Sequence, residues 1–126
     1  MSSIARVIAV SAALLCAVAA PASAQNVNLD ANYGNLNLST GFTPDPVLVN
    51  LTAGGSVNVA STINNCSGYI SNAPDVQLTF AAGSLPLAIS VSSNVDTTLV
   101  INTPDGQWFC DDDSGDGVNP SLVFQP

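Results

Sequence analysis

The chain has 126 residues, of which nine are acidic and one is basic; it has no histidine, and its formal net charge is −8. All nine acidic residues are aspartates, and Arg6 is the single basic residue. This charge excludes nucleic acid and anionic membrane surfaces as electrostatic partners. The length suits one small domain, and the many Val, Leu, Ile and Thr residues with few charges indicate a chain that folds.

Residues 1–24 have the pattern of a secretory signal peptide. Arg6 precedes an apolar run over residues 7–20, and the small residues Ala22, Ser23 and Ala24 follow. This order predicts cleavage between Ala24 and Gln25, and hence a secreted or periplasmic protein. Residues 25–126 would then form the mature domain.

Two forms of membrane attachment are disfavoured. The apolar run contains Ser11 and ends at Pro21, so it is too short for a transmembrane helix, which needs about 20 apolar residues. Lipid attachment at Cys16 would need a small residue before the cysteine, whereas Leu15 stands there. We therefore expect no membrane insertion.

The two cysteines that remain after cleavage, Cys66 and Cys110, predict one disulfide. Export delivers the chain to an oxidising compartment, where two cysteines have a single possible pairing. The bond would close a loop of about 44 positions and contribute about 4 kcal/mol on the chain-entropy model. That is a large share of the stability of a small domain.

The mature part predicts strands and no helices. Polar and apolar residues alternate in short stretches, which clusters of Gly, Pro, Asn and Asp separate. Gly54-Gly55 and the stretch 103–106 predict hairpin turns. In chain order the predicted strands cover residues 35–38, 47–51, 57–59, 69–70, 76–80, 87–91, 97–101, 107–110 and 122–124, with 97–101 placed centrally. This number of strands predicts an all-β fold, an antiparallel sandwich or barrel.

Four aromatic residues, Phe42, Tyr69, Trp108 and Phe109, lie in or near these strands. They could stack on a sugar or a peptide. Aromatic residues beside strands are more often part of the core, so we expect them to be buried or partly buried.

The densest polar feature is an aspartate-rich loop that begins directly after Cys110. Asp111, Asp112, Asp113 and Asp116 lie within six positions. Calcium takes six to eight oxygen ligands and would relieve the repulsion among these carboxylates. Asp96, which precedes the strand that pairs with 107–110, is the distant carboxylate best placed to join them. The alternative is that the aspartates accept hydrogen bonds from backbone amides of a tight, solvated loop.

Most catalytic chemistries lack their residues here. Without His or Lys, serine triads, Ser-Lys dyads and histidine-based metal sites are excluded. Carboxylate chemistry alone is left, through an aspartic dyad or a pair of glycosidase acids. The turn Asp96-Thr97-Thr98 lacks the glycine that an aspartic protease has at its third position. We therefore expect no enzyme activity.

Several motifs resemble bacterial pre-peptidase C-terminal domains, most closely the small exported members. The specific part extends from Asp96 to Asp113, with Pro104-Asp105-Gly106 between them; the stretches 32–34, 40–46, 53–56 and 66–70 add to it. The resemblance implies a jelly-roll-like β-sandwich that accompanies secreted peptidases without being the peptidase. Related collagen-binding modules bind calcium, which favours the same ion here.

The resemblance also implies a further strand after 122–124, whereas this sequence stops at Pro126. We therefore expect a truncated domain with an open sheet edge. Such an edge invites self-association or strand addition by a partner.

Taken together, the sequence predicts a non-catalytic exported binding or accessory module that contacts a protein or a polymeric substrate. Calcium is the expected structural ion. One alternative is a structural or vestigial exported domain without a ligand, and a more remote one is an aspartate-based hydrolase.

Overall fold

The computed structural model describes residues 25–126. The predicted signal peptide (1–24), including Ala24 at the predicted cleavage site, lies outside the described residues. Apart from one three-residue 3-10 helix, the regular secondary structure of the described part consists of strands, which confirms the all-β class. The elements are β1 (Asn35–Ser39), β2 (Val57–Asn58), the 3-10 helix η1 (Val59–Ser61), β3 (Tyr69–Ile70), β4 (Gln77–Ala81), β5 (Leu87–Ser90), β6 (Leu99–Asn102), β7 (Trp108–Asp111) and β8 (Ser121–Phe124). No helix among residues 25–126 has the length and apolar character needed to span a membrane.

The strands pair two by two: β1 with β4, β2 with β3, β5 with β8 and β6 with β7. Three of the pairs are antiparallel, as predicted. The β1–β4 pair is parallel, with Leu36 beside Leu78 and Leu38 beside Phe80. The antiparallel prediction is wrong for this pair, because alternation reports which face is buried and not the direction of the neighbouring strand.

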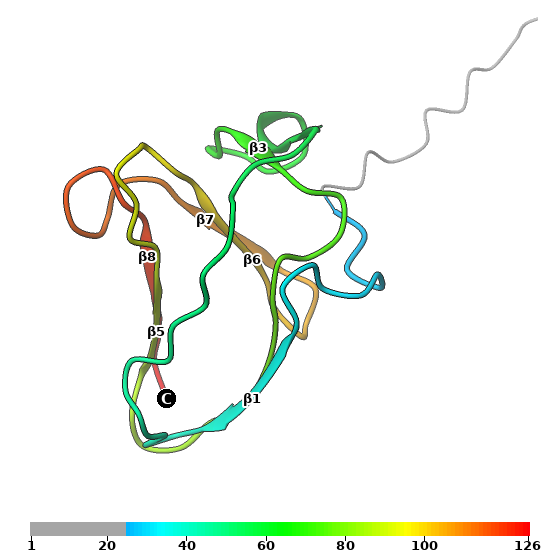
Figure 1. The fold of residues 1–126 in the computed structure, drawn as a ribbon. Coiled ribbons are helices and arrows are strands. Elements are labelled where there is room, and N and C mark those ends of the chain that lie inside the picture. The colour runs from blue at the N-terminus through cyan, green and yellow to red at the C-terminus, as the bar shows by residue number, and fades with distance from the viewer. Residues whose placement is uncertain (1–24) are drawn as a thin grey trace, which may run out of the picture.

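The predicted strand 47–51 and its hairpin at Gly54-Gly55 are absent. Residues 47–51 form no ladder, and the segment from β1 to β2 runs from one end of the molecule to the other (Figure 1). Gly55 serves a close approach instead. A Cβ on Gly55 would lie 2.1 Å from the carbonyl oxygen of Ile70, so only glycine lets the chain pass so close to β3.

The β6–β7 hairpin matches its prediction. The amide of Thr103 donates to the carbonyl of Gln107 at 2.9 Å, and Gly106 takes a positive φ of 81°. The hydroxyl of Thr103 is the main cause that lowers the pKa of Asp105 in this turn. The central position predicted for 97–101 is wrong, since β6 pairs only with β7 among the described strands.

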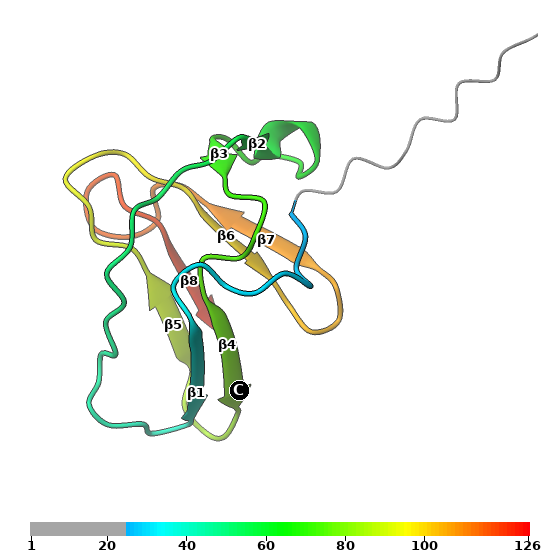
Figure 2. The same ribbon diagram turned by 45° about the vertical axis from the view of Figure 1, so that its right-hand side comes forward.

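The four strand pairs lie toward two ends of the molecule. The β1–β4 and β5–β8 pairs converge at the bottom of Figure 1, where the β4–β5 loop joins them. The β2–β3 pair lies at the opposite end, next to the upper end of the β6–β7 hairpin (Figure 2). The loops that precede β6 and follow β7 lie side by side at this end in both views.

The core is small and sits at the β2–β3 end. Val59, Ile63 and Cys66 are buried, and Ile70, Val100, Trp108 and Cys110 pack against them. The Cys66–Cys110 disulfide runs through this cluster and joins Cα atoms 5.8 Å apart. It therefore links β7 to the segment before β3.

The aromatic residues divide. Trp108 packs against the core, as expected. Phe109 is 38% exposed and meets Phe124 edge-on, with ring centroids 5.6 Å apart. Tyr69 is 60% exposed, which contradicts the expectation that it belongs to the core. The side chains of neighbouring residues in a strand point to opposite faces, and here Ile70 takes the inward position next to Tyr69.

Replacing both bridged cysteines, C66A with C110A, should lower the free energy of unfolding by about 2–4 kcal/mol, because the open chain gains entropy when unfolded. Urea unfolding followed by Trp108 fluorescence measures this. The exposed change Ser56→Ala is the control and should stay within about 0.5 kcal/mol of the parent protein. Equal stability of the double variant and the control would contradict the role of the disulfide.

Candidate functional site

Three carboxylates from two loops come together at the β2–β3 end of the molecule. One carboxylate oxygen from each of Asp96, Asp112 and Asp113 lies within 4.8 Å of the others. The β6–β7 ladder pairs Leu99 with Asp111, so the residues just before β6 meet those just after β7. We call Asp96, Asp112 and Asp113 the aspartate triad. Asp96 thus reaches the aspartate-rich loop, as predicted.

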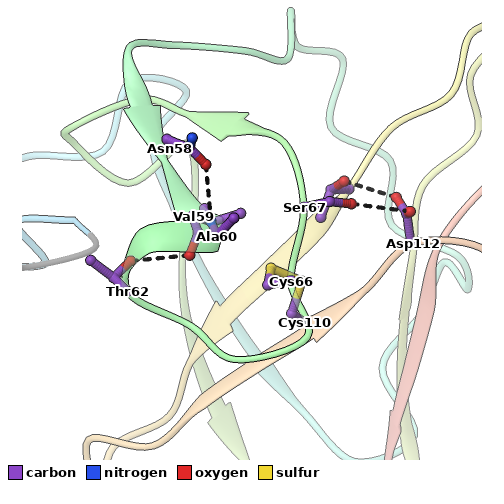
Figure 3. Close-up of a disulfide and its surroundings, with 9 residues drawn as sticks. Asn58, Val59, Ala60, Thr62, Cys66, Ser67, Cys110 and Asp112 are labelled. Carbon is purple, nitrogen blue, oxygen red and sulfur yellow. Dashed lines mark hydrogen bonds between the residues drawn. A yellow bond between two sulfur atoms is a disulfide. The ribbon is translucent and has the colours of Figure 1, made fainter.

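Asp112 is held in place from both sides. The hydroxyl of Thr98 donates to its Oδ1 at 2.9 Å, and the hydroxyl of Ser67 donates to its Oδ2 at 3.3 Å. Figure 3 shows Ser67 and Asp112 pointing toward each other beside the disulfide. Because Ser67 follows Cys66 and Asp112 comes two residues after Cys110, the covalent bond positions both partners.

Asp111 has a different role from the triad. Its carboxylate accepts hydrogen bonds from the amide of Ser121 at 2.7 Å and from the amide of Ser114 at 3.1 Å. The hydroxyl of Ser114 also donates to it, and this bond is the main cause that lowers the pKa of Asp111. Asp111 thus ties the loop to the start of β8, as the alternative interpretation of the loop expects.

Asp116 also lies outside the triad. Its backbone carbonyl accepts from the amide of Asn119 at 3.2 Å and from the Asn119 side chain at 3.0 Å. The structure therefore brings together three of the five predicted calcium ligands, while Asp111 and Asp116 shape the loop. Ion binding by the three stays a prediction.

Asp113 bears the electrostatic strain of the site. Loss of solvation raises its pKa, and the negative charges of Asp112, Asp96 and Asp111 raise it further. Residues 25–126 contain no Lys, Arg or His that could offset these charges. No side chain of residues 25–126 therefore neutralises the triad.

Sequence reasoning missed the two hydroxyls that hold Asp112. Ser67 follows a bridged cysteine, and Thr98 lies two residues after Asp96. The predicted disulfide already implied that the residues after Cys66 meet those after Cys110. That link was the available signal for Ser67.

The other predicted positions are placed as follows. Cys66 and Cys110 form the predicted disulfide. Gln25 is the first described residue, and its side-chain amide donates to the carbonyls of Ser71 and Ala73. Cleavage between Ala24 and Gln25 stays a prediction.

Comparisons of the chain with protein-family models, with curated proteins and with solved structures gave no match. The resemblance to pre-peptidase C-terminal domains therefore stays a prediction.

Two charge-removing variants should act in opposite directions. In metal-free buffer at neutral pH, Asp113→Asn should raise the melting temperature, because it removes a carboxylate whose pKa is raised in the folded state. Asp111→Asn should lower the melting temperature, because its pKa is lowered by hydrogen bonds that stabilise the charged form.

The Asp113 difference should shrink as the pH falls toward the ordinary aspartate value of 3.8, and the Asp111 difference should shrink as the pH falls below 3.8. The Asp113 penalty is lost as the pH falls through its raised folded value. The Asp111 contribution is lost as the pH falls through its lowered one. Melting curves of the three proteins across this range measure both effects, and shifts of the same sign would contradict the assignment.

Proposed function

We propose that this protein is a non-catalytic exported binding or accessory module that contacts a protein or a polymeric substrate and uses calcium as a structural ion. The proposal includes a β-sandwich arrangement of the pre-peptidase C-terminal type. The convergence of the aspartate triad at the disulfide carries it.

Calcium suits the triad for chemical reasons. Oxygen atoms are its preferred ligands, and three carboxylates supply enough charge to hold a divalent ion while leaving positions for water or a ligand. The neighbouring hydroxyls of Thr98 and Ser67 keep Asp112 oriented. Asp96 accepts no hydrogen bond from the described residues, so its carboxylate can turn toward an ion.

The aspartate-based hydrolase is the weaker alternative. A general acid of this type needs a carboxyl with a raised pKa inside a cleft. Asp113 has the raised pKa but is exposed, and it does not line the one hollow found beside the triad among the described residues, which Asp96 and Asp112 do line. Its position therefore favours ion binding over proton transfer.

The structural or vestigial alternative differs from a binding module in having no ligand. Capture of proteins from the exported fraction on the immobilised protein separates the two. A partner retained by the parent protein and lost with a triad variant supports the binding module, and no retained partner supports the structural domain.

Calcium should raise the melting temperature relative to the same protein in EDTA. At free calcium about ten to a hundred times the dissociation constant, the expected stabilisation is about 1.4–2.7 kcal/mol. Asp96→Asn should abolish the shift, because it removes one ligand without breaking a hydrogen bond within the described chain. Thermal melting under oxidising conditions measures both.

The matched control is Asp45→Asn, which removes the same charge from the segment after β1. This variant should keep the full calcium shift. Superimposable curves with calcium and with EDTA would overturn the calcium site, and an equal loss in the Asp45 variant would reduce it to a general charge effect.

A second candidate is self-association through a strand edge. Each described strand pairs with one other strand, which leaves its second edge without a ladder. On β8, Val123 is 54% exposed. An added strand would satisfy the open amides and carbonyls and cover such side chains.

If this edge pairs, the molar mass should rise with protein concentration in size-exclusion chromatography with light scattering. Val123→Lys should keep the protein monomeric, because a lysine on an edge strand opposes pairing. Leu48→Lys is the control, since Leu48 is 79% exposed and lies outside the strands. A monomer at all concentrations contradicts edge pairing.

A further inference from the structure

A hollow of about 420 Å³ adjoins the triad. Its walls come from five parts of the chain: the segment before β2, the stretch from Ser67 to β3, Asp75 between β3 and β4, the loop before β6 and the start of the loop after β7. Asp96 and Asp112 belong to both the hollow and the triad. The volume falls in the range of about 300–1,000 Å³ that ligand sites usually have.

The walls carry three carboxylates, Asp75, Asp96 and Asp112. Both oxygens of Asp112 accept hydrogen bonds from protein hydroxyls, so its position is set before any ligand arrives. Asp75 is oriented through Oδ1, which accepts from Asn32 at 3.2 Å and from Ser71 at 3.1 Å. The carboxylate of Asp96 accepts no hydrogen bond from the described residues.

Apolar and aromatic surface lies in the same walls. Tyr69 is 60% exposed and Val95 is 61% exposed, and both line the hollow. Exposing so much of a strand tyrosine leaves a large amphipathic face in water that burial would stabilise. Aromatic faces next to carboxylates attract cations, and alkyl groups cover the apolar part.

Thr97 also belongs to the walls of the hollow. Its hydroxyl oxygen is buried without a hydrogen-bond partner among the described residues. Such orphaned groups are rare in folded proteins. Because the oxygen itself is shielded from solvent, a ligand in the hollow would contact the carboxylates, Tyr69 and Val95.

We propose that the hollow receives an arginine side chain of a partner polypeptide. The guanidinium group would donate to the carboxylates of Asp96 and Asp112, for which its planar fork of N–H groups is suited. Its flat face would lie against the ring of Tyr69, and its alkyl stem would cover Val95. The positive charge of the arginine complements residues 25–126, which carry nine aspartates and no basic side chain.

The same carboxylates cannot hold an ion and a guanidinium group at full strength. Calcium at the triad would occupy Asp96 and Asp112 and reduce the negative charge of the hollow. Calcium should therefore weaken binding of the partner. This regulatory step rests on the proposed calcium function, whereas arginine binding in EDTA does not.

The test uses a fluorescent Gly-Ser peptide that contains two arginines and a matched peptide with citrulline in their place. Fluorescence anisotropy with the exported protein in EDTA should show binding of the arginine peptide about tenfold tighter or more, because citrulline keeps the shape but lacks the charge. Asp96→Asn and Tyr69→Ala should each weaken binding about three- to tenfold, while Asp45→Asn should leave it unchanged.

Equal affinity for the two peptides overturns the arginine site, as does equal loss in the Asp96 and Asp45 variants. Calcium added at constant ionic strength should weaken binding of the arginine peptide. Asp113→Asn should lessen this effect of calcium, because Asp113 belongs to the triad and does not line the hollow. If calcium raises the melting temperature but leaves the affinity for the arginine peptide unchanged, the proposed competition is wrong and the arginine site stands. A melting curve that does not respond overturns the ion site and leaves arginine binding to be judged on the peptides.

Discussion

A single covalent bond between Cys66 and Cys110 holds together the parts of the chain that form both the core and the acidic site. The buried hydrophobic side chains are few and lie around this bond. The disulfide therefore contributes stability that a larger domain would gain from packing of its core. It also places Ser67 against Asp112. Stability and the geometry of the site therefore depend on the same link.

The second constraint is charge without an internal counter-ion. The described residues carry nine aspartates and no basic side chain, and the β6–β7 hairpin draws three of those aspartates into one place. Hydrogen bonds satisfy Asp112 and Asp111, whereas Asp113 stays among like charges that raise its pKa. Such an arrangement costs folding energy, which favours a cation from outside, whether a metal ion or a partner's side chain.

The spacing of the aspartates in the sequence does not predict which of them join the triad. Asp111 and Asp112 are neighbours, yet Asp111 is the last residue of β7 and bonds to the start of β8, while Asp112 turns toward Thr98 and Ser67. Asp112 and Asp113 lie beyond the end of β7, where strand alternation no longer sets the direction of side chains, so only the folded loop shows which carboxylates join the triad. The sequence did not predict the hollow either, because its walls come from segments that are far apart in the chain.

By itself, the sequence determined the all-β class, the positions of most strands, the 103–106 turn and the disulfide, because alternation, turn residues and a single pair of cysteines after residue 24 are local or combinatorial signals. Only the tertiary structure decided that β1 and β4 run parallel, that 47–51 forms no ladder and that Gly55 passes against Ile70. Strand direction and close backbone approach depend on partners distant in the chain, and no local pattern encodes them. Tyr69 belongs with these features, since its exposure follows from the face that β3 presents.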